Sequence, residues 1–158
     1  MPHAKRTPAG EALSSLILDL FRLNSLLFTA GDRMVAGLGL TSARWQILGA
    51  IVAAERPQPV AWLARDLGAA RQNVQRIVND LQRDGLVSFE TNPHHRRAQF
   101  VVLTEKGRQS FDSAMRLQLP WVNGLADGLA LKDLEATSRV VSALRGRLEG
   151  SEEPDERA

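Results

Sequence analysis

The sequence predicts a mainly α-helical fold with one small β-hairpin, and three observations carry this prediction. Apolar residues recur every three or four positions through most of the 158 residues, as on the buried side of a helix. Two short helical stretches, joined by a brief link, follow each other over residues 60–84. Directly after them the period changes to that of two β-strands flanking a polar loop.

The first predicted helix spans residues 11–37 and has two apolar sides. One side is a stripe at helical spacing, formed by Leu13, Leu16, Ile17, Leu20, Leu23, Leu27 and Met34. The second side contains Leu18, Phe21, Phe28 and Val35. A helix with two apolar sides must be covered twice. Its own domain covers one side, and either the rest of a monomer or a second subunit covers the other.

The middle of the chain predicts a helix, a loop and a pair of short helices. The helices are expected at residues 42–54, 60–67 and 70–84, with a loop over the "RPQP" of residues 56–59. Thr41 or Ser42 can cap the first of these helices, and Gly68 and Gly85 end the other two. The close spacing of the last two helices predicts a helix-turn-helix.

The second half of the chain adds a hairpin and two helices. Strands are expected at 86–91 and 98–103 around the loop "NPHHRR". Thr104 caps a helix that is bent or broken before Pro120 and continues to about 127. A last amphipathic helix spans residues 131–149. This order predicts a winged helix-turn-helix with helical extensions at both ends.

The second helix of the pair has an outer face suited to reading DNA bases. Its inward stripe is formed by Val74, Ile77, Val78 and Leu81. Around the rest of the helix fall Arg71, Gln72, Asn73, Gln75, Arg76, Asn79 and Arg83. The acids Asp80 and Asp84 lie toward its C-terminal end. Amides and guanidinium groups are what major-groove readout needs. The alternative is a polar surface with no role.

The hairpin loop is unusually basic. Arg96 and Arg97 lie at its tip, and a narrow minor groove attracts an inserted arginine. A merely solvated pair of arginines is the alternative. His94 and His95 raise the question of a metal, but adjacent residues rarely share one ion and the only other histidine is His3. We therefore predict no metal site and no cofactor.

Composition excludes several classes of function. The chain carries a net +2, while residues 149–158 hold five acids and one base, so the remaining 148 residues carry +6 and favour an anionic partner. The absence of cysteine excludes disulfides and thiol redox sensing. No apolar run approaches the ~18–20 residues of a membrane span, and the first residues, "MPHAKRTPAGEA", lack the apolar core expected of a signal sequence. These features predict a soluble, cytoplasmic protein. No catalytic set of side chains is found, so we predict that it is not an enzyme.

Taken together, these motifs resemble the MarR family of winged-helix transcription regulators over roughly residues 11–149. "VAWLARDLGAARQNVQRIVNDLQRDGLV" resembles the family's helix-turn-helix, and "NPHHRRAQFVVLTEKG" resembles its wing. The resemblance implies a homodimer with interlocking N- and C-terminal helices, and a repressor that binds a palindromic operator until a small-molecule effector releases it. It implies DNA contacts for Arg71, Gln72, Asn73, Gln75 and Arg76 in the major groove. It also implies a minor-groove contact for Arg97.

The resemblance further implies a division of the chain and an effector pocket. We expect a flexible tail at 1–10, a helical dimerisation region at 11–37 and 108–149, a DNA-binding lobe at 38–107 and an acidic disordered tail at 150–158. A small aromatic or apolar effector would be walled by Leu23, Leu27, Trp45, Leu48 and Trp62. Apolar residues at helical spacing are more often core, and this alternative stays open. A winged helix used only for protein contacts is the second alternative for the function.

Two positions depart from the family pattern. His95 occupies the place of the acid that usually holds the wing arginine, so Arg97 is expected to be less fixed, or wing binding mildly pH-sensitive. Ala70 stands where a Ser or Thr usually caps the recognition helix. An uncapped start costs on the order of 1 kcal/mol unless a neighbour or a DNA phosphate supplies the acceptor.

Overall fold

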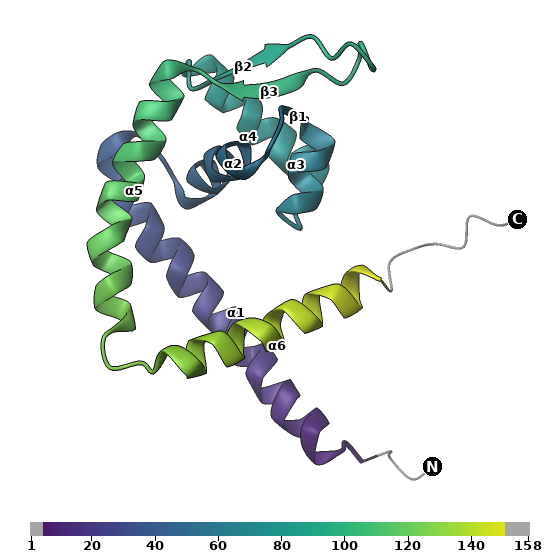
Figure 1. The fold of residues 1–158 in the computed structure, drawn as a ribbon, viewed down its shortest axis with the longest axis vertical. Helices are drawn as coiled ribbons and strands as arrows, with labels where there is room; N and C mark the ends of the chain where they lie inside the picture. Colours follow the sequence, from purple (N-terminus) through teal and green to yellow (C-terminus); the bar gives the residue numbers. More distant parts are fainter. Residues whose placement is uncertain (1–4, 151–158) are drawn as a thin grey trace, which may run out of the picture. The chain divides into compact units, whose positions relative to one another are not determined.

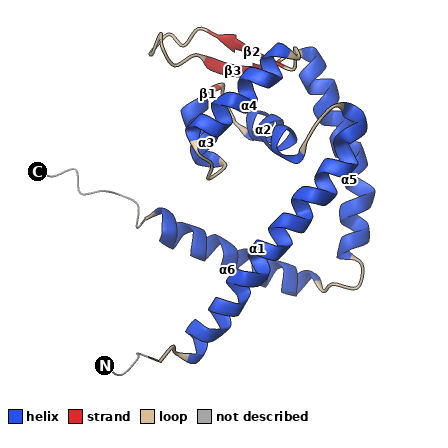
Figure 2. Ribbon diagram, turned by 180° about the vertical axis from the view of Figure 1, so that it is seen from behind, coloured by secondary structure: helices blue, strands red, loops and turns tan. Residues whose placement is uncertain are grey.

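The computed structural model describes residues 5–150 and divides the chain into two compact units, residues 1–119 and 120–158 (Figure 1). Residues 1–4 of the expected N-terminal tail and residues 151–158 of the expected acidic tail lie outside the described part. The chain is mainly helical with one small antiparallel sheet (Figure 2), and this confirms the predicted fold class.

The first helix, α1 (Pro8–Val35), starts three residues earlier than predicted. Thr7 caps it by accepting a hydrogen bond of 3.0 Å from the backbone N–H of Gly10. Pro8 occupies the first turn, where its missing N–H costs nothing, so a residue that looked like part of the tail begins the helix. The short 3₁₀ helix η1 (Ala36–Leu38) then leads into Gly39, whose φ of 67° turns the chain toward α2.

Three helices form the helix-turn-helix part of the first unit, as predicted. They are α2 (Ser42–Ala53), α3 (Val60–Asp66) and α4 (Arg71–Arg83). Thr41 rather than Ser42 caps α2, since its side chain accepts from the backbone N–H of Arg44. Gly68 and Gly85 end α3 and α4 with φ values of 60° and 75°. The core beneath them is formed by Val35, Leu40, Ile47, Leu48, Val60, Leu63, Ala64, Val74, Ile77, Val78, Leu81, Leu86, Val87, Val101 and Ala114.

The sheet has three strands, which corrects the expectation of a two-stranded hairpin with a loop at 56–59. The strands β1 (Gln58–Pro59), β2 (Val87–Glu90) and β3 (Phe100–Leu103) lie in the order β1-β3-β2, and both pairings are antiparallel. Gln58 pairs with Val101. A two-residue strand containing proline has no periodicity of its own. It becomes a strand only because β3 offers an edge.

Helix α5 (Glu105–Ala126) begins at the predicted cap and is not broken at Pro120. Thr104 accepts a hydrogen bond of 3.0 Å from the Gly107 N–H and donates one of 2.7 Å to the Gly85 carbonyl. Pro120 lies inside the continuous helix, so the prediction of a break before it is wrong. The boundary between the two compact units nevertheless falls at this proline.

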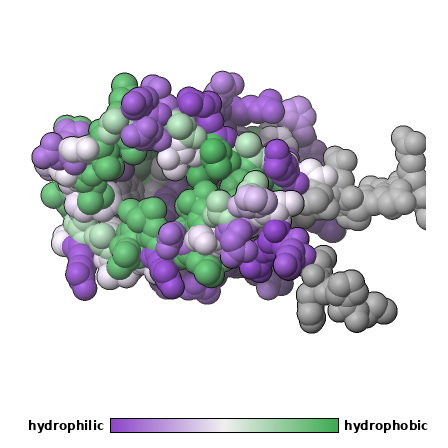
Figure 3. All heavy atoms as spheres, turned by 90° about the horizontal axis from the view of Figure 1, so that it is seen from below, coloured by the Kyte–Doolittle hydropathy of each residue, from purple (hydrophilic) through white to green (hydrophobic). Residues whose placement is uncertain are grey.

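The second unit contains the end of α5, a turn at Gly128 and α6 (Leu131–Glu149), whose bounds match the prediction. Within the described residues, neither α6 nor the part of α5 after Pro120 contributes a residue to the core. Large apolar side chains of this unit are exposed instead, among them Val122, Leu125, Leu131, Leu134, Val140, Val141 and Leu148. Figure 3 shows apolar side chains between the polar ones on one face of the molecule.

The expectation that no segment approaches a membrane span needs correction for α1. The helical stretch Pro8–Leu38 has the length for a span, and its most apolar window has a mean hydropathy of 1.3. The prediction counted uninterrupted apolar runs, whereas this helix mixes small polar residues with apolar ones. Length and composition alone do not distinguish a span from the core helix of a soluble protein. No residue of this window is fully buried within the chain, so its apolar side chains are at most partly covered by the described residues.

Candidate nucleic-acid interface

The recognition helix α4 has the two faces that its sequence predicts. Val74, Ile77, Val78 and Leu81 are buried in the core. The opposite side is exposed at Arg71, Gln72, Asn73, Arg76 and Asn79, while Gln75 is half-buried. The helix therefore presents amides and arginines to the surroundings along its N-terminal half.

The polar side chains of this face are partly ordered by contacts with one another. Gln75 Nε2 donates to Asn79 Oδ1 at 2.9 Å, and Arg76 Nη2 donates to Asn73 Oδ1 at 2.9 Å. Each contact joins residues one helical turn apart. The amide groups of Asn73 and Asn79 keep their own N–H donors available for a partner.

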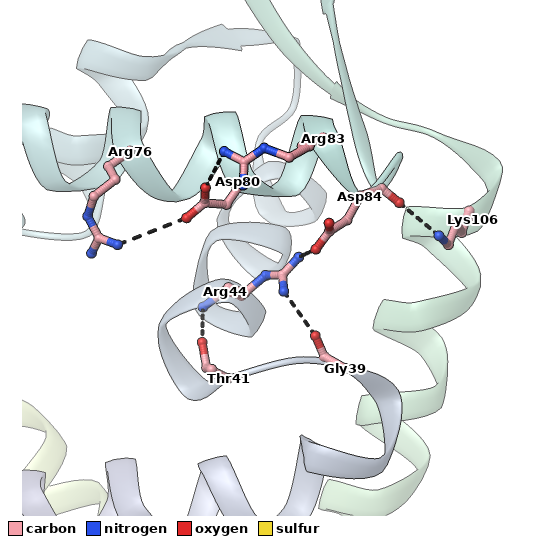
Figure 4. A network of polar contacts seen from close by, with 8 residues as sticks. All are labelled: Gly39, Thr41, Arg44, Arg76, Asp80, Arg83, Asp84 and Lys106. Carbon is pink, nitrogen blue, oxygen red and sulfur yellow. Dashed lines mark hydrogen bonds and ion pairs between the residues drawn. The ribbon is translucent and has the colours of Figure 1, made fainter.

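The two acids at the end of α4 are held by arginines (Figure 4). Asp80 accepts from Arg83 at 2.8 Å and lies 4.0 Å from Arg76. Asp84 pairs with Arg44 of α2. Their negative charges are therefore compensated within the protein and oppose an anionic partner less than free carboxylates would.

Arg44 of α2 binds both the end of α4 and the segment after α1. Its side chain is 18% exposed, bonds to Asp84 and donates a second hydrogen bond of 3.0 Å to the Gly39 carbonyl. Lys106 at the start of α5 donates to the backbone carbonyl of Asp84 at 2.8 Å. The end of the recognition helix is thereby fixed to α2, α5 and the segment after α1 (Figure 4).

The wing loop is held from inside by Asn92. This side chain is 7% exposed, donates to the Ala98 carbonyl at 3.0 Å and accepts from the His94 N–H at 3.0 Å. Backbone bonds from His95 to Asn92 and from Ala98 to His95 complete the turn. One buried amide therefore connects the two limbs of the loop.

Arg96 and Arg97 are exposed on this loop. Within residues 5–150, neither guanidinium group has a hydrogen-bond or ion-pair partner. His95 is exposed and does not contact Arg97 through any such bond. The expectation that Arg97 is less fixed, because His95 stands where the resemblance implies an acid, agrees with this lack of a bond in the described residues.

A cleft of about 280 Å³ separates the recognition helix from the wing. It is lined by Pro59, Val60, Ala61, Arg71, Gln75, Asn79, Phe89, Arg97, Ala98 and Gln99. Four of the predicted DNA-contacting residues, Arg71, Gln75, Asn79 and Arg97, therefore share one hollow. Gln72, Asn73, Arg76 and Arg96 lie outside it. The start of α4 at Ala70 has no side-chain cap, as its sequence indicates.

The five residues expected to wall an effector pocket lie in different environments. Leu48 is 0% exposed and belongs to the core, while Trp45 is half-buried and packs against the core. Leu23 and Leu27 are exposed on α1. Trp62 is exposed on α3, with the guanidinium carbons of Arg56 and Arg65 5.7 and 6.0 Å from its ring centre. The cleft beside the wing is lined by none of the five.

Sequence reasoning missed three residues that shape this surface. Asn92 could have been predicted, because an asparagine side chain in a turn commonly accepts a hydrogen bond from the backbone N–H two residues further along the chain. Arg44 and Gln99 could not have been predicted, because their roles depend on contacts with segments distant in the sequence. In the described part of the chain, no three His, Cys, Asp or Glu side chains are grouped closely enough to hold a metal ion.

The structure has a winged helix with an exposed face of amides and arginines, beside a hairpin whose arginines have no partner among the described residues. These features define a DNA-binding protein.

The model of the MarR family matches residues 38–98. The chain is 37% identical over 140 residues to the uncharacterized protein Rv2011c of Mycobacterium tuberculosis, covering 86% of this chain and 96% of that protein. It is 32% identical over 107 residues to the transcriptional activatory protein BadR of Rhodopseudomonas palustris, covering 65% and 59%.

Solved structures have the same fold. The Mycobacterium tuberculosis transcriptional regulator MosR, in complex with DNA, superposes with a TM-score of 0.73 at 24% identity and covers 86% of this chain and 97% of its own. The transcriptional repressor CouR, bound to a 23-mer DNA duplex, gives a TM-score of 0.73 at 24% identity and covers 89% and 99%. The chain belongs to the MarR family. It is a DNA-binding transcription regulator and not an enzyme.

Proposed function

We propose that this regulator is a homodimer that binds a palindromic DNA operator and represses transcription until a small molecule releases it. The observation that carries the proposal is an exposed face of amides and arginines on α4, next to a wing whose two arginines have no partner among residues 5–150. The acids of the same helix are neutralised by arginines. This surface therefore offers hydrogen-bond donors and positive charge together.

Self-association is supported by apolar surface at both ends of the chain. On α1, Phe21 and Leu26 are each 67% exposed, and the second unit has no buried core of its own among the described residues. Burying apolar surface lowers the free energy of an assembly by about 25 cal/mol for each Å² removed from water. Helices with this much uncovered apolar surface need a partner, and a second copy of the chain supplies matching surface under twofold symmetry.

In the proposed complex, each α4 enters a major groove and each wing enters the adjacent minor groove. Arg71, Gln72, Asn73, Gln75, Arg76 and Asn79 form the contacts of the helix, and Arg96 and Arg97 form those of the wing. Twofold symmetry places the two helices in successive major grooves, about one helical turn apart. The operator is therefore expected to be palindromic.

The direction of regulation is the finer part of the proposal. CouR is a transcriptional repressor and BadR is a transcriptional activatory protein, so proteins similar to this chain act in both directions. We propose repression in the cytoplasm, relieved by an aromatic or apolar effector that binds near Leu23, Leu27, Trp45 and Trp62. Leu48 is too deeply buried to touch a ligand without repacking of the core.

The experiment is footprinting of the purified protein on the DNA upstream of its own gene, repeated at several salt concentrations. Operator binding by this surface should protect two symmetric half-sites. It should also weaken steeply with salt, because each neutralised phosphate releases a counterion. Failure to protect any symmetric site would contradict the proposal and favour a winged helix used for protein contacts, which salt affects little.

Effector release is tested on the same footprint. Aromatic acids are added to the bound complex, with non-aromatic acids of equal charge as the control. Loss of protection with the aromatic compounds alone supports release by an effector. Unchanged protection across a broad set of such acids would contradict this part of the proposal.

A further inference from the structure

The cleft between α4 and the wing lies between the two elements that the proposed function places in adjacent grooves of DNA. A phosphodiester backbone separates the major groove from the adjacent minor groove. If α4 occupies one groove and the wing the next, as in the proposed function on which this inference rests, that backbone crosses the space between them. The cleft of about 280 Å³ occupies this space in the first unit, since residues of α4 and of the β2–β3 hairpin line it.

The lining of the cleft has the chemistry of an anion site. Arg71 enters from the recognition helix and Arg97 from the wing, and neither guanidinium group has a partner among residues 5–150. Gln75, Asn79 and Gln99 add amide groups. No Asp or Glu lines the cleft, and its remaining lining is Pro59, Val60, Ala61, Phe89 and Ala98. Two arginines that no acid of the described residues neutralises therefore line one cleft.

We propose that this cleft holds a single backbone phosphate of the operator, gripped by Arg71 from one side and Arg97 from the other. Guanidinium groups bind phosphate oxygens through paired, charge-assisted hydrogen bonds. Arg71 then positions the protein on DNA and does not read a base. Arg97 contacts the phosphate at the edge of the minor groove, and Arg96 remains as the arginine that reaches furthest into that groove.

This assignment separates two groups of residues on one helix. Arg76, Gln72 and Asn73 lie outside the cleft and face the bases, so they determine the sequence that is recognised. Arg71 lies in the cleft and contributes equally to every sequence. Phosphate contacts and base contacts change different measurable quantities, since the first alter the salt dependence and the second alter the discrimination between sequences.

The test uses operator duplexes in which one phosphate at a time is replaced by a neutral methylphosphonate. For the wild-type protein, one position in each half-site should weaken binding by about tenfold, as expected for loss of a charge-assisted contact. The Arg71→Ala and Arg97→Ala variants should each lose most of this sensitivity at that same position. Arg76→Ala, the matched arginine variant outside the cleft, should keep the full sensitivity.

A second readout is the salt dependence. Arg71→Ala should lower the slope of log affinity against log salt by about one, while the preference for operator over mutated operator stays the same. Arg71→Lys should restore the slope, because it restores the charge. Circular dichroism melting of each variant shows whether α4 still folds, and Arg71 is exposed enough for the fold to tolerate alanine.

The outcomes separate this inference from the proposed function. If the protein binds a symmetric operator but no single phosphate couples to both Arg71 and Arg97, the phosphate site is wrong and the proposed function stands. If Arg71→Ala relaxes the preference at one base pair, Arg71 reads a base and the inference is overturned. If no operator is bound at all, the proposed function itself fails.

Discussion

The side-chain amide of Asn92 donates a hydrogen bond of 3.0 Å to the backbone carbonyl of Ala98 and so closes the loop of the wing. His95 occupies the position where the family resemblance predicts an acid, and among residues 5–150 Arg97 has no hydrogen-bond or ion-pair partner. The geometry of the wing therefore depends on a bond between its two limbs. The charged tip is free to meet DNA.

Replacing Asn92 by alanine should weaken both the fold and operator binding. The variant leaves the Ala98 carbonyl and the His94 N–H without their partner, which costs about 1–3 kcal/mol when such groups are buried. Urea unfolding and operator titration measure the two effects. Asn92→Asp keeps the acceptor for His94 and loses the donor to Ala98, so it isolates the second bond. The exposed neighbour Thr91→Ala serves as the control, and equal behaviour of the two alanine variants would contradict this role.

Arg44 and Asp84 should be energetically coupled. Arg44→Met removes the ion pair and the bond to the Gly39 carbonyl, and we expect a loss of about 1–2 kcal/mol in the free energy of unfolding. A double-mutant cycle with Asp84→Asn should give a coupling near 1 kcal/mol. Arg65→Met is the control, because its pair with Asp66 is exposed and worth little. Additive effects of Arg44→Met and Asp84→Asn would show that the contact contributes nothing.

Two glycines in α5 should respond in opposite directions to alanine. A Cβ at Gly107 would overlap the backbone oxygen of Leu86, so Gly107→Ala forces the helix away from the segment that leads into β2. We expect a loss on the order of 3 kcal/mol. At Gly124 nothing lies within 4 Å, and alanine should stabilise the helix by up to about 1 kcal/mol. Thermal melts of both variants check the prediction, and a Gly107→Ala protein as stable as wild type would refute the close approach.

Phe21→Glu should impair self-association. Phe21 is 67% exposed on α1, and a charge placed in an apolar interface must be desolvated without a partner. Sedimentation should show a shift toward monomer, and operator affinity should fall because one recognition helix binds without the other. Arg22→Glu changes a neighbouring exposed position and is the control. A Phe21→Glu protein that remains fully dimeric would place the interface elsewhere.

Arg76→Ala should reduce specific binding by roughly 1–3 kcal/mol, the range of a base contact. Its guanidinium group is exposed and already directed by Asn73, at 2.9 Å, so little ordering is needed on binding. Competition between operator and unrelated DNA measures the specific part. Arg139→Ala on α6 removes the same charge from a helix that is not part of the helix-turn-helix, and serves as the control. Unchanged discrimination in the Arg76 variant would remove this residue from the base contacts.

The sequence by itself determined the helices, the recognition face and the fold class. Apolar spacing fixed which side of α4 is buried, because Val74, Ile77, Val78 and Leu81 recur at the helical period. Local chemistry also determined the ends of the elements, since Thr104 and Gly85 act through neighbours close in the chain. Pro120 shows the limit of such local signals, because the helix continues through it.

Only the tertiary structure decided which distant residues meet. The strand β1 at Gln58 forms because β3 lies beside it. Arg44 pairs with Asp84 because α2 packs against α4. In the same way, Arg71 and Arg97 line one cleft because the hairpin that carries Arg97 packs beside the recognition helix. Periodicity reports which face of an element is buried. The partner across that face depends on how the elements pack, and no local pattern contains this information.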